Sequence, residues 1–492
     1  MFGWLRTKSS KREPMRRDLP VASSATQAGA IIRAARFIRA RYDAAVTNDE
    51  NRRHWANADC LSADAAASPD VRRLLRNRAR YEVANNSYAK GIVLTLANDV
   101  IGTGPRLQLL SDDGEANQRI EREFMRWAKA VGLADKLRTM RMARATDGEA
   151  FAILASNPKL PTAVRLDLRL IEADQVTTPD LSILDDNAID GIVFDAASNP
   201  VEYHVLKQHP GDTRGRGLGL DYDRVPAESV IHYFRADRPG QSRGIPDITP
   251  ALPLFAQLRR YTLAVLGAAE TAADFAGILY TDAPPDGQAE SVEPMDAIEL
   301  EARSLLTMPG GWKMAQVQAE QPSTTYGEFK KEILNEIARC LNMPFNVAAA
   351  NSSGYNYASG RLDHQTYFKS IRVEQEHIGL VVLDRIFTAW ISEAVLVEGL
   401  LPQSARLRDA ELPHQWFWDG NEHVDPVKEA SAQATRLQSH TTTLAREYAE
   451  QGLDWETELR QRAKEVALMQ ELGLTIEQPV PIGKEAGDDG EN

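Results

Sequence analysis

The order of segments in the second half of the chain constrains its fold more than any single motif does. Residues 247–275 carry apolar side chains at helical spacing, and this pattern stops at the Pro- and Gly-rich run at 282–287. Helical spacing returns over 326–341 and again over the longer stretch 358–399, with a polar run of Asn, Ser and Gly at 351–356 between them. We therefore expect two helices with an inserted segment, followed by a loop and a long helix.

The inserted segment is acidic and contains a turn. Residues 282–330 hold nine acidic residues and three basic ones, Arg303, Lys313 and Lys330. Two strand-like pieces, near 303–308 and 312–318, flank a Pro-Gly-Gly turn. We therefore expect a small β unit that projects from the two helices.

The middle of the chain changes from helical to alternating periodicity. Residues 115–147 have the spacing of two helices. After them, Leu166, Leu168 and Leu170 alternate with charged residues, which is typical of a strand with one buried face. Strands are predicted near 148–155, 164–170, 190–195, 200–206 and 228–235, and C-terminal helices near 426–451 and 455–472. The expected fold class is α+β and mostly helical.

Charge is distributed unevenly along the chain. The 492 residues carry a net charge of −13, yet residues 1–90 hold 18 Lys/Arg and nine Asp/Glu. A basic segment ahead of an acidic body indicates contact either with nucleic acid or with the acidic surface of a neighbouring subunit. No window holds the roughly 18 apolar residues of a membrane helix, and the N-terminus lacks the apolar core of a signal peptide. We expect a cytosolic chain with no membrane partner, whose Cys60 and Cys340 are reduced core thiols.

The motifs of common enzymes are missing from the sequence. No Walker loop occurs, the glycine-rich run at 215–219 lacks dinucleotide spacing, and the nine histidines form no zinc motif. Glu328-Phe329-Lys330 is the one acid-x-Lys triplet of the kind that a metal-dependent nuclease uses, and we interpret it as the solvated first turn of a helix. We therefore expect no catalytic residues, no metal site and no cofactor.

Four groups of motifs occur in a fixed order along the chain. They are Asn85–Gly91 with Asn98–Gly104; Val230–Phe234 with Arg238–Pro246; Tyr326–Phe329, Ile337–Arg339, Met343–Phe345 and Asn356–Arg361; and Val424–Ala430 with Gly452–Asp454. In these motifs the sequence resembles the lambda-type family of tailed-bacteriophage or prophage portal proteins. The resemblance extends from about residue 85 to 472 and so covers nearly the whole chain.

The resemblance implies a portal-like subunit with named parts. In chain order these are a flexible basic arm (1–27), an α+β wing (28–246), a stem helix (247–275), a clip (276–325), a second stem helix (326–343), a tunnel loop (344–358), a long wing helix with its connection (359–412), a helical crown (413–475) and a disordered acidic tail (476–492).

The resemblance also implies a function. It implies a ring of twelve copies at one vertex of the capsid, which is the conduit for double-stranded DNA during packaging and ejection. The other implied partners are the terminase large subunit, a head-completion or adaptor protein, the major capsid protein and scaffold. The implied location is the virion, after assembly in the cytoplasm of the bacterial host. A head-tail adaptor ring or a packaging-associated nuclease is the alternative, but adaptors are usually much shorter and a nuclease needs a carboxylate cluster.

The tunnel loop supplies the first set of candidate site residues. It has few large apolar side chains, so we expect it to be mobile, and it has no Lys or Arg. A neutral loop can face DNA without gripping it, because each neutralised phosphate adds affinity that opposes sliding. The candidates are Asn346, Asn351, Ser352, Ser353, Tyr355 and Asn356.

Two further sets follow from the resemblance and from charge. The clip acids Glu290, Glu293 and Asp296 are candidates for docking the terminase, since an acidic target raises association rates. Arg238, Arg243 and Arg361 are candidates for contacts between subunits. We interpret Trp416, Phe417 and Trp418 as core or intersubunit packing, because a passing duplex offers no exposed bases for stacking.

Overall fold

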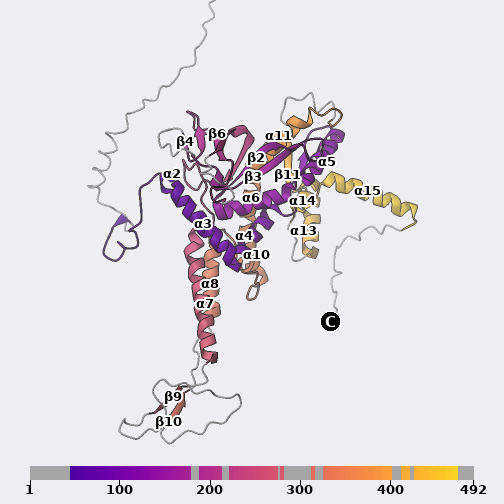
Figure 1. Cartoon of the computed structure of the whole chain (residues 1–492). Coiled ribbons are helices and arrows are strands. Elements are labelled where there is room, and N and C mark those ends of the chain that lie inside the picture. The colour runs from indigo at the N-terminus through magenta and orange to yellow at the C-terminus, as the bar shows by residue number, and fades with distance from the viewer. Residues whose placement is uncertain are drawn as a thin grey trace, which may run out of the picture. The chain divides into compact units, whose positions relative to one another are not determined.

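A computed structural model of the chain describes residues 45–178, 188–212, 221–274, 278–281, 312–315, 325–401, 412–420 and 426–474. The chain divides into two compact units, Met1–Leu61 and Ser62–Asn492, and the helices and strands discussed here belong to the second. The expected α+β, mostly helical fold class is confirmed (Figure 1). Among the described residues, no helix combines the length and the apolar character that a membrane crossing requires.

The second unit begins with five helices, of which the last three contribute buried side chains to the main core. They are α2 (Ala63–Ala66), α3 (Pro69–Asn85), α4 (Ser87–Ile101), α5 (Gly114–Ala130) and α6 (Leu133–Asp147). The side chain of Asn86 caps α4 by accepting hydrogen bonds from the amides of Tyr88 (3.1 Å) and Ala89 (3.4 Å). This explains why an Asn pair stands between two helices that follow each other directly.

Two antiparallel sheets follow, and they confirm the strands expected in the middle of the chain. Strand β2 (Glu149–Ser156) lies between β3 (Leu166–Ile171) and β8 (Val230–Phe234). The second sheet is a meander of β4 (Ala188–Ile189), β5 (Ile192–Phe194), β6 (Pro200–Leu206) and β7 (Tyr222–Pro226). In β3, Leu166 and Leu168 are buried and Arg169 is exposed, as the alternation predicts.

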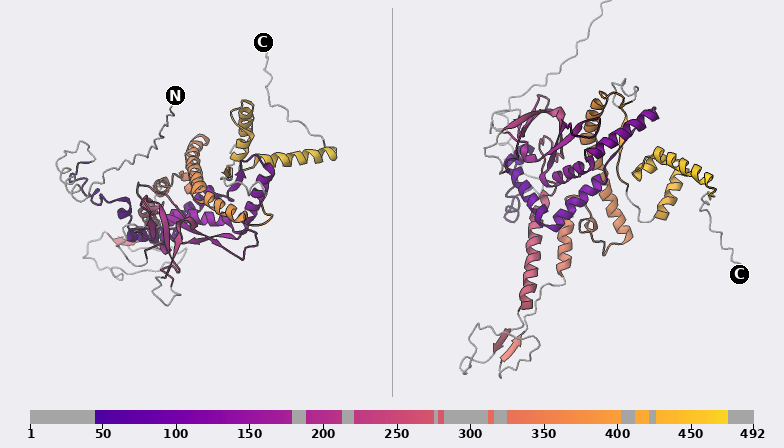
Figure 2. Two further views of the ribbon diagram at one scale, coloured as in Figure 1. Left: turned by 90° about the horizontal axis from the view of Figure 1, so that it is seen from above. Right: turned by 45° about the vertical axis from the view of Figure 1, so that its right-hand side comes forward.

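The helix pair with an insertion is also present. Helices α7 (Leu252–Asp274) and α8 (Thr325–Arg339) lie side by side (Figures 1 and 2). Between them in sequence, β9 (Ile278–Thr281) pairs antiparallel with β10 (Trp312–Ala315), which confirms part of the strand expected at 312–318. The strand expected at 303–308 lies outside the described residues.

The long helix expected at 358–399 is a continuous run of three pieces. These are α10 (Tyr357–Ile378), the π-helical turn η5 (Gly379–Leu383) and α11 (Asp384–Ala394). A short helix, α9 (Phe345–Ala348), precedes it. At the C-terminus the pattern expected as one helix at 426–451 is two, α13 (Pro426–Gln438) and α14 (Leu444–Glu450), because Thr443 caps a new helix; α15 (Trp455–Glu471) follows.

The aromatic run at 416–418 packs in the core. It lies in and after β11 (His414–Phe417), which pairs antiparallel with β1 (Arg106–Leu109); neither strand was expected. The Trp416 ring lies 5.7 Å from that of Phe124, and its Nε1 donates a hydrogen bond to Asp384 (2.8 Å). Core packing of this run is therefore confirmed. Both cysteines are free, as expected, but a core position is wrong for Cys60, which is exposed; Cys340 is half-buried and packs against the main core.

A fully buried ion pair joins the first sheet to the loop before α7. Arg243 Nη2 lies 2.7 Å from Glu149 Oε1, and both side chains are 0% exposed. Glu149 also accepts hydrogen bonds from the Arg243 Nε (2.9 Å) and the Gly244 amide (3.0 Å), and lies 3.0 Å from His232 Nε2. Burial would raise the pKa of Glu149, but Arg243 and His232 outweigh it and hold that pKa well below its ordinary value.

Backbone contact around this ion pair requires two glycines. Gly148 has a φ of +92°, and a Cβ there would lie 2.5 Å from the carbonyl carbon of Ile245. A Cβ on Gly244 would lie 2.1 Å from the Gly148 oxygen. The Arg-Gly pair at 243–244 in the sequence motif is therefore explained by the fold: the arginine fills the core and the glycine admits the neighbouring backbone.

Three arginines of α3 extend the buried charge network. Their spacing of four residues places them on one face of the helix. They reach acids on other elements: Arg72 pairs with Asp190, Arg76 with Asp174 (2.9 Å) and Arg80 with Asp147 (2.7 Å). Part of the positive charge of residues 1–90 is therefore neutralised inside the subunit. These three arginines are therefore not available for contact with nucleic acid or a neighbouring subunit, the two kinds of contact that the charge count alone indicates.

We predict that Glu149→Gln lowers the free energy of unfolding by about 3–5 kcal/mol, because Arg243 then stays buried without its carboxylate. The matched control is Asp70→Asn, which breaks the exposed Asp70–Arg73 pair and should cost less than about 1 kcal/mol. Urea unfolding followed by tryptophan fluorescence at one protein concentration measures both. Equal midpoints for the two variants would show that the buried pair does not stabilise the fold.

Candidate functional site

The segment at 344–358 has a buried half and an exposed half. Pro344 begins α9, and Met343, Phe345 and Ala348 are buried in the main core. The expectation that the segment has too few apolar side chains to pack is therefore wrong for its first half. A chain that is anchored in this way can present its second half at a fixed place.

The second half is neutral and exposed. Asn351, Ser352, Ser353 and Asn356 are exposed, and Tyr355 is half-buried. Asn351 Oδ1 accepts a hydrogen bond from the Ser353 amide (2.9 Å), and Asn356 Oδ1 accepts one from the Ser359 amide (2.9 Å), which caps α10. Burial and the Asp363 carboxylate raise the pKa of Tyr355, so the hydroxyl stays neutral. No charged side chain stands between 344 and 358.

Asn346 ties the two halves to the long helix. Its Nδ2 lies 2.8 Å from His364 Nε2 on α10. The amide is thus engaged inside the subunit, whereas the sequence analysis counted it with the residues that face DNA. The signal for this role was absent from the sequence, since nothing marks His364 as its partner.

The long helix that carries this segment is fixed to the core by polar contacts. The Tyr367 hydroxyl donates to Asp99 (2.6 Å), and Gln375 Nε2 donates to the Val100 carbonyl (3.1 Å). Glu374 pairs with Arg144, a fully buried arginine. Burial alone would raise the pKa of Glu374, but Arg141 and Arg144 outweigh it and lower that pKa. These contacts fix the middle and the C-terminal end of α10 to the core.

The other candidate residues lie apart from this segment. Arg243 is fully buried and paired with Glu149, so its expected role between subunits is wrong. Arg238 and Arg361 are exposed, Arg361 on α10. Glu290, Glu293 and Asp296 lie outside the described residues.

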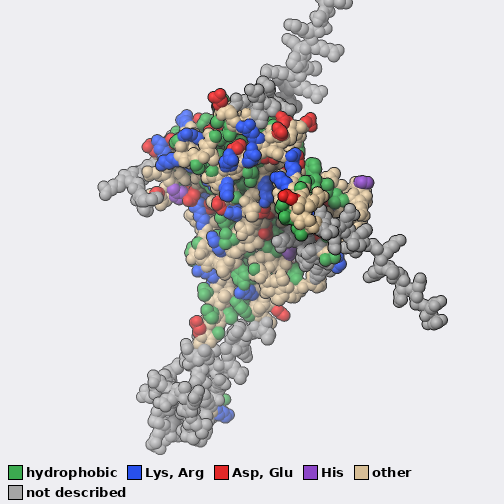
Figure 3. Space-filling model, turned by 90° about the vertical axis from the view of Figure 1, so that its right-hand side faces the viewer, with side chains coloured by type: hydrophobic (Ala, Val, Ile, Leu, Met, Phe, Trp, Pro, Cys, Tyr) green, Lys and Arg blue, Asp and Glu red, His purple; other side chains and the backbone are tan. Residues whose placement is uncertain are grey.

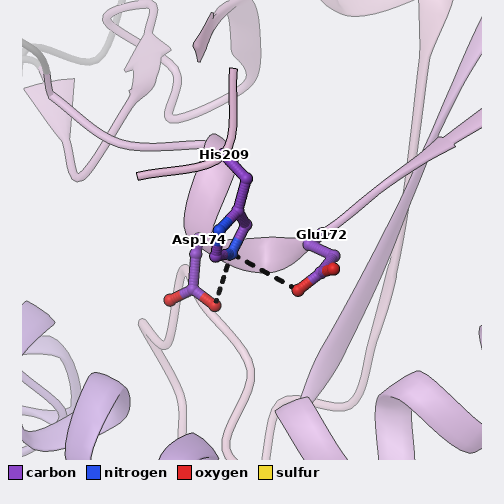
Figure 4. Close-up of side chains that lie close together, drawn as sticks. All are labelled: Glu172, Asp174 and His209. Carbon is purple, nitrogen blue, oxygen red and sulfur yellow. Dashed lines mark ion pairs between the residues drawn. The ribbon is translucent and has the colours of Figure 1, made fainter. Parts of the chain in front are cut away.

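A group of metal-ligand type that the sequence analysis missed lies near α3. His209 Nε2 is 3.4 Å from Glu172 Oε2 and 3.7 Å from Asp174 Oδ2 (Figure 4). Asp174 is also paired with Arg76 (2.9 Å) and Arg80 (2.8 Å). Burial would raise the pKa of Asp174, but the two arginines lower it. Because two guanidinium groups already neutralise these acids, we assign the group to the ion-pair network of α3.

Known proteins resemble this chain in sequence over most of its length. Residues 30–375 match the family model described as "Phage portal protein, lambda family". The "Probable portal protein" of Halomonas phage phiHAP-1 is 28% identical over 436 residues, which are 83% of this chain and 82% of that protein. "Portal protein B" of Escherichia phage lambda is 20% identical, covering 86% of this chain and 88% of that protein. Among solved structures, "Neck of native GTA particle computed with C12 symmetry" matches with a TM-score of 0.43 and 14% identity, over 78% of this chain and 94% of that one.

We predict that His364→Ala loosens the segment at 344–358. Loss of one side-chain hydrogen bond costs about 1 kcal/mol, which raises the population of the detached segment about fivefold. Hydrogen exchange of the amides at 345–356 should speed up by about that factor. In the control Gln365→Ala, on an exposed neighbouring position, the rates should stay as in the wild type. Unchanged exchange in both variants would show that His364 does not hold the segment.

Proposed function

The chain belongs to the lambda family of phage portal proteins, and we propose on this premise that copies of it close into a ring of twelve at one capsid vertex. Its function is that of a portal protein, the conduit for double-stranded DNA of the phage head. Family membership also confirms the expectation that it is a structural protein and not an enzyme.

Exposed apolar side chains support the self-association. Leu263 and Leu266 of α7 are 58% and 54% exposed, and Leu362 and Val373 of α10 are 65% and 66% exposed. Phe329 of α8 is 50% exposed. Neighbouring copies that cover these helices gain about 25 cal/mol for each Å² of apolar surface removed from water. The cyclic ring is the arrangement in which every copy covers another.

The parts of the subunit take the roles that the sequence analysis named. In this proposal α7 and α8 are the stem, 276–325 is the clip, 344–358 is the tunnel loop, and the sheets with α2 to α6 and α10 to α11 are the wing. The helices α13 to α15 are the crown, residues 1–27 the arm and 476–492 the acidic tail.

One observation carries the DNA-conduit geometry: a neutral, exposed loop is held on a buried base. Phe345 and Ala348 fix the loop in the core, and Asn351, Ser352 and Ser353 are presented to solvent without any charge. Such a loop can contact phosphates by weak hydrogen bonds and releases no counterions, so DNA slides past it. We assign DNA contact to Asn351–Asn356 and the anchoring role to Asn346.

The other partners are assigned by charge and by family. We propose that the clip, with Glu290, Glu293 and Asp296, docks the terminase large subunit and later the head-completion or adaptor protein. The major capsid protein and scaffold contact the ring in the procapsid, which assembles in the cytoplasm of the bacterial host. Arg238 and Arg361 remain candidates for contacts between copies.

The one motif that favours the nuclease alternative is Glu328-Phe329-Lys330. Glu328 is exposed in the first turn of α8, and Lys330 Nζ lies 5.0 Å from the centre of the Tyr88 ring. The lysine is thus held by an aromatic side chain on α4. This arrangement supports the interpretation of the triplet as an ordinary helix start. An adaptor ring is disfavoured because residues 30–375 of this chain match a family of portal proteins.

We predict that the double variant Asn351→Lys, Ser352→Lys slows DNA translocation. Each added lysine supplies a phosphate contact and steepens the salt dependence of DNA affinity by about one in the log–log slope. Packaged DNA length, measured in vitro over a salt series, should fall at low salt and recover as salt rises. The control Asn351→Gln, Ser352→Thr keeps the loop neutral and should package normally. Normal packaging by the lysine variant at low salt would place the loop away from DNA.

A further inference from the structure

A row of basic side chains runs along the exposed face of α5. Arg119, Arg122, Arg126 and Lys129 follow each other at spacings of three, four and three residues, which places all four on one side of a helix. All four are exposed. The opposite side of α5 buries Phe124 in the core, so the row faces solvent. We call these four residues the basic row.

The charges of the basic row are only partly neutralised. Arg126, 63% exposed, pairs with Glu123 (2.7 Å), and Arg119 donates to the Gly399 carbonyl oxygen. Within the described residues, no ion pair engages the side chains of Arg122 and Lys129. Glu115 and the half-buried Glu121 are the other acids of α5. The helix therefore carries four basic and three acidic side chains, a net charge of +1, on a chain of net charge −13.

A hollow extends the basic row at its C-terminal end. Arg126 and Lys129 line it from α5, and Arg106 lines it from β1. Asp135 is the acid in its lining, and Asp135 pairs with Arg138. Figure 3 shows one face of the molecule, on which Lys and Arg side chains lie among acidic and apolar ones. The basic row therefore continues into a hollow whose lining also includes Pro105, Met125, Ala128, Leu133 and Ala134.

The composition of this surface favours a phosphate backbone over a protein partner. Protein interfaces have apolar or aromatic centres from which charged residues are depleted. Along α5, which is described in full, Met125 is the one large apolar side chain that is exposed, at 36%. The row spans eleven residues, or about 15 Å of helix, and duplex DNA carries about four phosphates per strand over that length.

We propose that the basic row and Arg106 bind the phosphate backbone of duplex DNA outside the channel. This inference rests on the proposed function, which brings packaged DNA to the ring. Binding of this kind is independent of base sequence and is strongly weakened by salt. It would give the outside of the ring an attraction for DNA that the neutral tunnel loop lacks.

The test uses assembled rings and covalently closed, relaxed circular DNA, which cannot thread through a closed channel. The variant Arg122→Gln, Arg126→Gln, Lys129→Gln neutralises the row. The control Arg460→Gln, Arg462→Gln, Lys464→Gln makes the same charge change at three exposed positions of α15. We expect the row variant to bind closed circles at least about tenfold more weakly, with the log–log salt slope reduced by about one per lost contact. The control should bind like the wild type.

Three results would overturn the proposal. They are unchanged affinity of the row variant for closed circles, an equal loss of affinity in the α15 control, and failure of the row variant to form rings, which would make the row a contact between copies. Failure of the proposed function is distinguishable, because the wild-type chain itself would then form no rings.

Discussion

The buried pair of Arg243 and Glu149 is the interaction on which the rest of the subunit depends. Glu149 begins β2, the central strand of the first sheet, and Arg243 lies in the loop that leads to α7. Arg243 also donates to the Val176 carbonyl (3.1 Å) and the Ala173 carbonyl (3.3 Å), so it also holds the segment that follows β3. Both side chains are 0% exposed, so the loss of any partner would leave a buried charge without a hydrogen bond. The ion pair therefore fixes one arrangement of these segments.

The ion-pair core explains how function and stability are separated in this chain. The groups whose charges set the fold, including those of α3, face inward on their own subunit. The residues assigned to DNA, Asn351–Asn356, are neutral and outside this network. A conduit needs this division, because basic side chains at the channel wall would bind the DNA phosphates. Charged side chains inside the subunit stabilise the fold and do not contact DNA.

The sequence predicts the elements whose pattern is local. Helical periodicity located the long helix near 358–399, and short apolar runs located the strands at 148–155 and 228–235, which are mostly buried. It missed β1 and β11, because a four-residue strand has little periodicity and its partner lies about 300 residues away.

The candidate site was likewise predictable only in part. The exposed polar run at 351–356 was predictable from composition, but the Asn346–His364 contact and the burial of Arg243 were not. A lone arginine in a loop has the same sequence signature whether it meets a neighbour or fills the core. The regular spacing of Arg72, Arg76 and Arg80 was visible in the sequence, yet its partners, Asp147, Asp174 and Asp190, are defined only by the tertiary fold.

The most direct test of the central claim, that this chain is a ring-forming portal subunit, is the mass of the purified full-length protein in solution. Mass photometry should show a discrete species of about twelve times the subunit mass of 54.5 kDa, stable across a range of salt concentrations. A single species with the mass of one subunit, at all protein and salt concentrations, would contradict the account.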